Sequence, residues 1–125
     1  MQRVFKTRHF ARWMRKTELS DAALRYAVDE MMRGLIDADL GGRVLKKRIG
    51  IAGRGKHGGA RTIVATNRGE RWFFVYGFEK NECANISSDE LEALQSLASE
   101  LLATTDRQLD VALADRTLQE VGHDK

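Results

Sequence analysis

Apolar residues recur along this chain with two different spacings, one typical of helices and the other of strands. Helical spacing appears in residues 10–14 and returns in residues 24–32, where Ser20 is suited to cap the helix and Gly34 to end it. The large apolar side chains of both segments are predicted to lie in the core. The first third of the chain therefore predicts a short strand at Val4–Phe5 followed by two helices.

The middle of the chain is rich in β-branched and aromatic residues, as strands are. The predicted meander has three strands, at 43–51, 60–66 and 71–78. Glycines predict a flexible loop at 52–59, and residues 67–69 are typical of a hairpin turn.

The last of these strands is apolar on both faces, which predicts a central position in the sheet. Alternation places Trp72, Phe74, Tyr76 and Phe78 on one face, with Phe73 and Val75 on the other. Core packing is the preferred interpretation of these aromatic side chains, and stacking on RNA bases is the alternative.

Two more helices are predicted near the C-terminus, each after a capping-box pair. Ser87 and Glu90 precede a leucine stripe that extends to about residue 103, and Thr105 with Gln108 precedes a weaker helix. The fold class is therefore α+β. We expect one domain over residues 1–125, helices packed on one face of a mostly antiparallel sheet, and a frayed tail from about residue 120.

Charge is divided unevenly between the two parts of the chain. Residues 1–78 contain 17 Lys and Arg against 7 Asp and Glu, whereas residues 79–125 contain 4 against 11. Residues 40–69 contain eight cations and no acid. Such a block repels itself unless a polyanion or an acidic surface neutralises it, which favours a nucleic-acid-binding face.

Several classes of site fit the sequence poorly. Residues 50–56 match G-x-x-x-x-G-K, but His57 follows where a P-loop needs Ser or Thr, and the next element is a strand rather than a helix. The one cysteine, Cys83, and three histidines have no zinc spacing, and no apolar run approaches membrane length. We expect no metal, no cofactor and no membrane, and a cytoplasmic location.

A basic surface can bind RNA, and it can also cut it. Cleavage by the RNA's own 2′-hydroxyl needs a base, cations that stabilise charge on phosphorus, and an acid for the leaving oxygen. A lysine crowded by other cations loses its proton more readily, and His57 can exchange protons near neutral pH. This chemistry requires no metal.

Several of these segments resemble the RelE/HigB toxins of the RelE/ParE superfamily, in particular a HigB-like branch. The matching segments are 46–49, 53–62, 74–82, 85–87 and 89–91. The resemblance implies a RelE-like fold and the toxin of a type II toxin–antitoxin pair. It also implies cleavage of mRNA in the 30S A site of the ribosome, which inhibits translation, and a cognate antitoxin of helix-turn-helix type.

Site residues follow from motif position and from the basic block. The predicted catalytic residues are Lys47, Arg48, Lys56, Arg61 and Lys80. The predicted RNA-binding residues are Arg43, Lys46, Arg54, His57, Arg68 and Asn81. Many RelE-type toxins have an arginine where this chain has Asn81, and a tyrosine where it has Asn85-Ile86-Ser87.

Two other functions remain open at this point. One is a basic nucleic-acid-binding protein without catalysis, which is distinguished from a nuclease by whether substitutions of Arg61 or Lys80 abolish cutting while leaving binding nearly intact. The other is a ParE-like toxin of the same fold that inhibits DNA gyrase, which would cause DNA damage signalling rather than mRNA cleavage.

Overall fold

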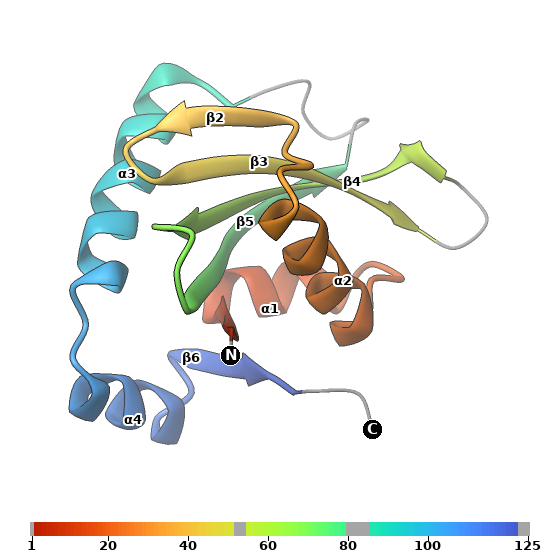
Figure 1. Cartoon of the computed structure of the whole chain (residues 1–125). Helices are drawn as coiled ribbons and strands as arrows, with labels where there is room; N and C mark the ends of the chain where they lie inside the picture. The colour runs from red at the N-terminus through yellow and green to blue at the C-terminus, as the bar shows by residue number, and fades with distance from the viewer. Residues whose placement is uncertain (1, 52–54, 80–85, 123–125) are drawn as a thin grey trace.

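The computed structural model describes residues 2–51, 55–79 and 86–122, with the side chains of residues 55–58 left out (Figure 1). Its elements are β1 (Arg3–Thr7), α1 (Arg8–Met14), α2 (Asp21–Met32), β2 (Ala38–Gly41), β3 (Val44–Ile51), β4 (Gly55–Thr66), β5 (Arg71–Glu79), α3 (Ser88–Leu102), α4 (Asp106–Ala114) and β6 (Leu118–Val121). The predicted α+β class is confirmed.

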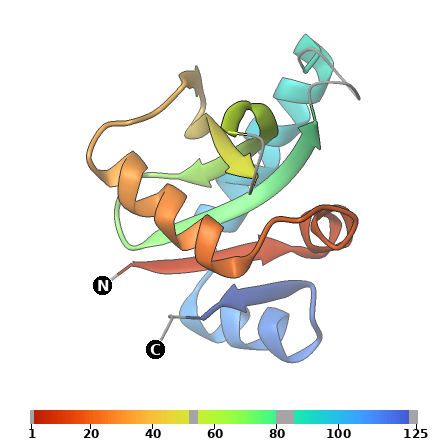
Figure 2. The same ribbon diagram turned by 90° about the vertical axis from the view of Figure 1, so that its right-hand side faces the viewer.

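The described strands form one sheet in the order β2-β3-β4-β5-β1-β6. The hairpins β2–β3, β3–β4 and β4–β5 are antiparallel, whereas β1 pairs with β5 in parallel. Figure 2 shows β1 (red) between β5 and β6. The predicted meander is therefore present, and both ends of the chain add strands beside it.

Helix starts occur where the capping residues predicted them. The Ser20 hydroxyl accepts a hydrogen bond from the Ala23 amide at 3.2 Å. Complete capping boxes begin α3, with Ser87 and Glu90, and α4, with Thr105 and Gln108. Each box satisfies amide donors that a helix start otherwise leaves without partners, which explains why local sequence located these ends well.

Helices cover both faces of the sheet, so the prediction of helices on one face is wrong. The side chains of α1 and α2 pack with one buried cluster, which includes Leu24, Trp72 and Phe74. The side chains of α3 and α4 pack with a second cluster, which includes Phe73 and Leu109. A central strand with two apolar faces needs a cover on each face, and this requirement explains the three layers.

A bulge in β5 corrects the predicted alternation of its aromatic residues. Ile63 pairs with Tyr76 but Val64 pairs with Phe74, so Val75 is an extra residue. A bulge reverses the faces of all later side chains. Phe78 therefore joins the cluster of α3 and α4, on the face opposite to Phe74.

The glycine segment is less of a loop than predicted, because β4 already begins at Gly55. Ile49 pairs with Ala60 whereas Ile51 pairs with Gly55, so extra residues of β4 lie opposite Gly50. A Cβ at Gly59 would lie 2.2 Å from the carbonyl oxygen of Ile49. Glycine here permits a close approach between two strands rather than a flexible loop.

The chain near residue 120 is an ordered strand rather than a frayed tail. β6 pairs antiparallel with β1, and Leu118 and Val121 are buried. Four-residue strands carry little periodicity, so the sequence pattern missed both β6 and β2. Among the described helices, none combines the length and apolar character needed to cross a membrane.

Candidate nucleic-acid interface

Two arginines face each other across the β3–β4 hairpin. Arg48 is the direct cross-strand partner of Arg61, and such partners have Cα atoms roughly 5 Å apart. Arg61 shares a strand face with Ile63, which belongs to the cluster under α3 and α4. The two cations therefore lie together on that face of the sheet, and we call them the arginine pair.

The arginine pair lies in a partly dehydrated position. Arg61 is only 5% exposed, and Arg48 is half-buried. Like charges directly opposite each other in a sheet are destabilising, and burial strengthens their repulsion. An arrangement of this kind stores unfavourable energy that a bound anion would relieve.

The hydrogen bonds of the arginine pair are incomplete. Arg61 Nη1 donates to the Gly59 carbonyl at 3.5 Å, and Arg48 Nε is buried without a hydrogen-bond partner. The Asp37 carboxylate accepts a hydrogen bond from the backbone amide of Arg48 at 2.6 Å. In residues 2–51, 55–79 and 86–122, neither arginine forms an ion pair with a carboxylate. Buried donors without partners are rare in proteins and often mark a ligand site.

Neighbouring positions add a further cation and two aromatic rings to this face. Lys46 is half-buried and pairs with Ile63. It lies two residues before Arg48 on β3, so both side chains point to the same face. Phe78 is the β5 partner of Arg61, and the ring of Tyr76 lies 6.0 Å from that of Phe78. The β5 bulge brings both rings to the face of the arginine pair.

Lys47 lies on the opposite face, and its surroundings do not support the predicted catalytic role. Its side chain is 3% exposed, and its ammonium lies 3.1 Å from the Glu30 carboxylate. The same Nζ donates to the Leu35 carbonyl at 2.8 Å. Because strand residues alternate between faces, Lys47 joins β3 to α2 while its two neighbours point away from α2.

Two of the predicted RNA-binding residues lie at the other end of the hairpin. Arg43 precedes β3, and Arg68 lies in the turn between β4 and β5, where it pairs with Asp39 at 3.0 Å. Both belong to a shallow hollow beside Thr66. The structure does not bring them together with the arginine pair.

The remaining predicted site residues fall outside the described part of the molecule. These are Arg54, Lys80 and Asn81, together with the side chains of Lys56 and His57. Their assignments stay predictions.

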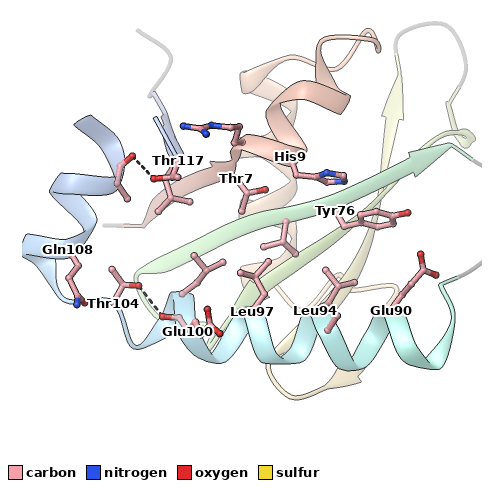
Figure 3. Close-up of a pocket in the computed structure, with 16 residues that line it drawn as sticks. Thr7, His9, Tyr76, Glu90, Leu94, Leu97, Glu100, Thr104, Gln108 and Thr117 are labelled. Carbon is pink, nitrogen blue, oxygen red and sulfur yellow. Dashed lines mark hydrogen bonds between the residues drawn. The ribbon is translucent and has the colours of Figure 1, made fainter. Parts of the chain in front are cut away.

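A wide groove lies on the same side of the sheet, and neither member of the arginine pair lines it. It has a volume of about 890 Å³ and separates α3 from β5 and the start of α1 (Figure 3). Leu94 and Leu97 line one side of the groove, and His9 and Tyr76 line the opposite side. Sequence analysis missed His9, although its spacing to Arg12 and Lys16 is the helical one that places side chains on a shared face.

Across 2–51, 55–79 and 86–122, no three His, Cys, Asp or Glu side chains lie close enough together to hold a metal ion.

Comparison with known proteins gives one family. The model of the RelE toxin of the RelE/RelB toxin–antitoxin system matches residues 2–121. A search of curated proteins finds no significant match. The matched range contains the whole sheet, all four described helices and the arginine pair. The chain therefore belongs to the RelE toxin family of toxin–antitoxin systems.

Proposed function

We propose that this RelE-family protein is an mRNA endoribonuclease that cuts messenger RNA on the ribosome and thereby inhibits translation. The observation that carries the proposal is the arginine pair, two partly buried guanidinium groups without a carboxylate partner in the described residues. Guanidinium groups bind phosphate through two parallel hydrogen bonds. The pair therefore suits a phosphodiester, whose charge increases during cleavage.

The proposed reaction uses the RNA's own 2′-hydroxyl. Its oxygen attacks the adjacent phosphorus, the bond from phosphorus to the 5′-oxygen breaks, and the products are a 2′,3′-cyclic phosphate and a 5′-hydroxyl. Arg48 and Arg61 stabilise the extra negative charge on the phosphoryl oxygens in the transition state. A base must take the 2′-hydroxyl proton and an acid must protonate the leaving oxygen. We assign these transfers to the set formed by Lys46 and the predicted residues Lys56, His57 and Lys80.

The proposed partners follow from the family and from charge. Membership of the RelE family implies an antitoxin. We propose a HigB-like toxin, active in the cytoplasm, whose antitoxin is of helix-turn-helix type and covers the basic face with an acidic segment. The ribosomal 30S A site presents the mRNA to the arginine pair.

Induction in a bacterial host, followed by mapping of new mRNA 5′ ends, tests this function. The wild-type chain should arrest growth and produce cuts in phase with codons. Arg48→Gln and Arg61→Lys should abolish the cuts, because one removes a charge and the other removes the two-pronged hydrogen bonding. Arg107→Gln removes an exposed charge from α4 and should leave the cuts unchanged.

Two other outcomes would contradict the proposed function. Arrest with DNA damage signalling and no new 5′ ends would replace this proposal with gyrase inhibition. Soluble wild-type protein without arrest or cuts would leave a binding protein without catalysis. Variant proteins that unfold cooperatively on heating are folded, so their loss of cutting is a loss of chemistry.

A further inference from the structure

A small pocket lies between α1 and the C-terminal part of β5, next to the interface. Its volume is about 310 Å³, and α1 with the turn after it contributes His9, Arg12, Trp13 and Lys16. β5 contributes Tyr76 and Phe78. We call it the stacking pocket, because flat rings and cations dominate its walls.

The walls of the stacking pocket consist largely of flat rings, which suit a flat ligand. The rings of His9 and Tyr76 are stacked, with centroids 5.6 Å apart and planes 6° from parallel. A Cβ at Gly77 would lie 2.3 Å from Trp13 Cζ3, so only glycine lets the indole lie directly on the strand. His9 is exposed, whereas Trp13 and Tyr76 are half-buried. The aromatic surface is thus held in place and still reaches solvent.

Charge gives the stacking pocket a preference for anionic ligands. Arg12 and Lys16 are exposed and lie four positions apart, and no acidic side chain is among the described residues that line the pocket. Sites for single-stranded nucleic acid combine these two features, aromatic rings for the bases and cations for the phosphates.

One residue links the stacking pocket with the arginine pair. Phe78, which lines it, is the cross-strand partner of Arg61. Without the extra residue Val75, Tyr76 and Phe78 would point to the other face of the sheet. The bulge therefore brings the aromatic rings of the stacking pocket to the face of the sheet that carries the arginine pair.

We propose that the stacking pocket binds an unpaired RNA base adjacent to the phosphate held by the arginine pair, an assignment that rests on the proposed function. The base stacks against the His9–Tyr76 rings, and Arg12 and Lys16 hold the flanking phosphates. The pocket would then help to select which nucleotide lies beside the cleaved bond.

Tryptophan fluorescence of the purified chain measures this binding directly. The chain has two tryptophans, and Trp72 is fully buried in the core, so a ligand-dependent change reports on Trp13. The probe is a six-nucleotide single-stranded RNA with 2′-O-methyl groups, which cannot be cleaved. We expect quenching by this RNA and much weaker binding of the same backbone with its bases removed.

Two aromatic substitutions separate the stacking pocket from general surface effects. His9→Ala should weaken binding about five- to 150-fold, the range measured for loss of one base-stacking side chain. Tyr26→Ala is the matched control, because Tyr26 is 60% exposed on α2 and lies outside the pocket. It should bind the RNA as the wild type does.

Three results would overturn the nucleobase assignment. They are equal affinity of His9→Ala and wild type, equal affinity for the RNA and its base-free backbone, and a loss of antitoxin binding by His9→Ala with RNA binding intact. The last would identify the pocket as a protein-docking site. If the RNA binds as expected but no mRNA is cut in cells, the stacking pocket stands and the cleavage proposal fails.

Discussion

Adjacent cations on β3 have opposite surroundings although they share the same charge. Lys47 is buried against Glu30, while Arg48 has a buried Nε without a partner. The alternation of strand residues separates them, since one points to α2 and the other to the face of α3. At the scale of the residue, position within the pleat decides whether a cation stabilises the fold or is available to a ligand.

The ion pair between Lys47 and Glu30 should be strongly coupled to folding. Glu30→Gln leaves a buried ammonium without its counter-charge and should destabilise the chain by about 3–5 kcal/mol. The double variant Glu30→Met with Lys47→Met removes both charges and should lose far less. Urea denaturation measures both. Equal losses in the single and double variants would contradict a coupled pair.

Substitution within the arginine pair should stabilise the chain, in contrast to substitution of Glu30. Arg48→Gln relieves the repulsion from Arg61 and should raise the free energy of unfolding by about 0.2–1 kcal/mol while mRNA cleavage is lost. Arg107→Gln on the surface of α4 serves as the control and should change neither. Thermal unfolding and mapped 5′ ends are measured on the same proteins. A destabilised Arg48→Gln would show that the pair does not store repulsion.

Gly77 should tolerate no side chain. Alanine there places a Cβ against Trp13 and should cost about 1–3 kcal/mol, as overpacking usually does. Gly122→Ala is the matched control, because no atom lies within 4 Å of a Cβ there. Denaturant unfolding compares the two. If both substitutions had the same small effect, the indole would not be held against β5.

Elements at the two ends of the chain stabilise each other. β6 pairs with β1, and the Arg3 guanidinium binds the Glu120 carboxylate at 2.9 and 3.0 Å, which raises the pKa of Arg3. The turn before β6 is closed by Asp115, whose carboxylate accepts from the Thr117 amide at 2.9 Å. At this scale, a strand of only four residues is stable because it completes an existing sheet.

Substitution of Val121 tests how much β6 contributes to the free energy of unfolding. It is 1% exposed, so Val121→Ala should cost about 1.5 kcal/mol or more through lost burial and a cavity. Val111 on α4 is 59% exposed, and Val111→Ala should be nearly neutral. Equilibrium unfolding measures both substitutions. Equal effects would mean that β6 adds no packing energy.

Acid should open the turn before β6, because that turn depends on the ionised carboxylate of Asp115. Hydrogen bonds from Thr117 lower the pKa of Asp115, so its stabilising effect is complete above the usual aspartate pKa and is lost as pH falls through the lowered value. Thr117→Val removes the hydroxyl donor, and the turn before β6 should then open at a higher pH than in the wild type. Amide exchange of β6 as a function of pH measures this. Identical profiles would exclude a role for the hydroxyl.

Charge is divided unevenly along the whole chain. The basic residues are concentrated before residue 79 and the acidic residues after it. Both the proposed substrate and an acidic antitoxin segment would compete for the basic part, because opposite charge attracts each of them. Under the proposed function, an antitoxin that occupied the arginine pair would inhibit the toxin.

Salt should therefore weaken the antitoxin complex. We expect antitoxin affinity to fall at least about tenfold between 0.05 and 0.5 M NaCl, as surface electrostatics become screened. Arg48→Glu should weaken the complex as well, while Arg107→Glu on α4 should not. Calorimetry over a salt series measures this. If neither salt nor the charge reversal at Arg48 changed the affinity, the antitoxin would bind to another surface of the protein.

Features that depend on near neighbours could be predicted from the sequence alone. Capping residues located the helix starts, β-branched runs located the meander, and the basic block from 40 to 69 contained Arg48 and Arg61. Motif resemblance indicated the toxin family, which the family match over residues 2–121 confirms. Local hydrogen bonding and short-range periodicity suffice for such predictions.

Which cations lie together, and what covers each face of the sheet, depends on tertiary packing. The bulge at Val75 turns Tyr76 to the face of the sheet that carries Arg61. One-residue shifts of this kind leave no trace in a sequence whose alternating apolar residues suit either face. The burial of Lys47 depends on Glu30, 17 positions earlier and on another element. Contacts between residues distant in sequence depend on packing, and it is packing that separates the structural cations from those that face a ligand.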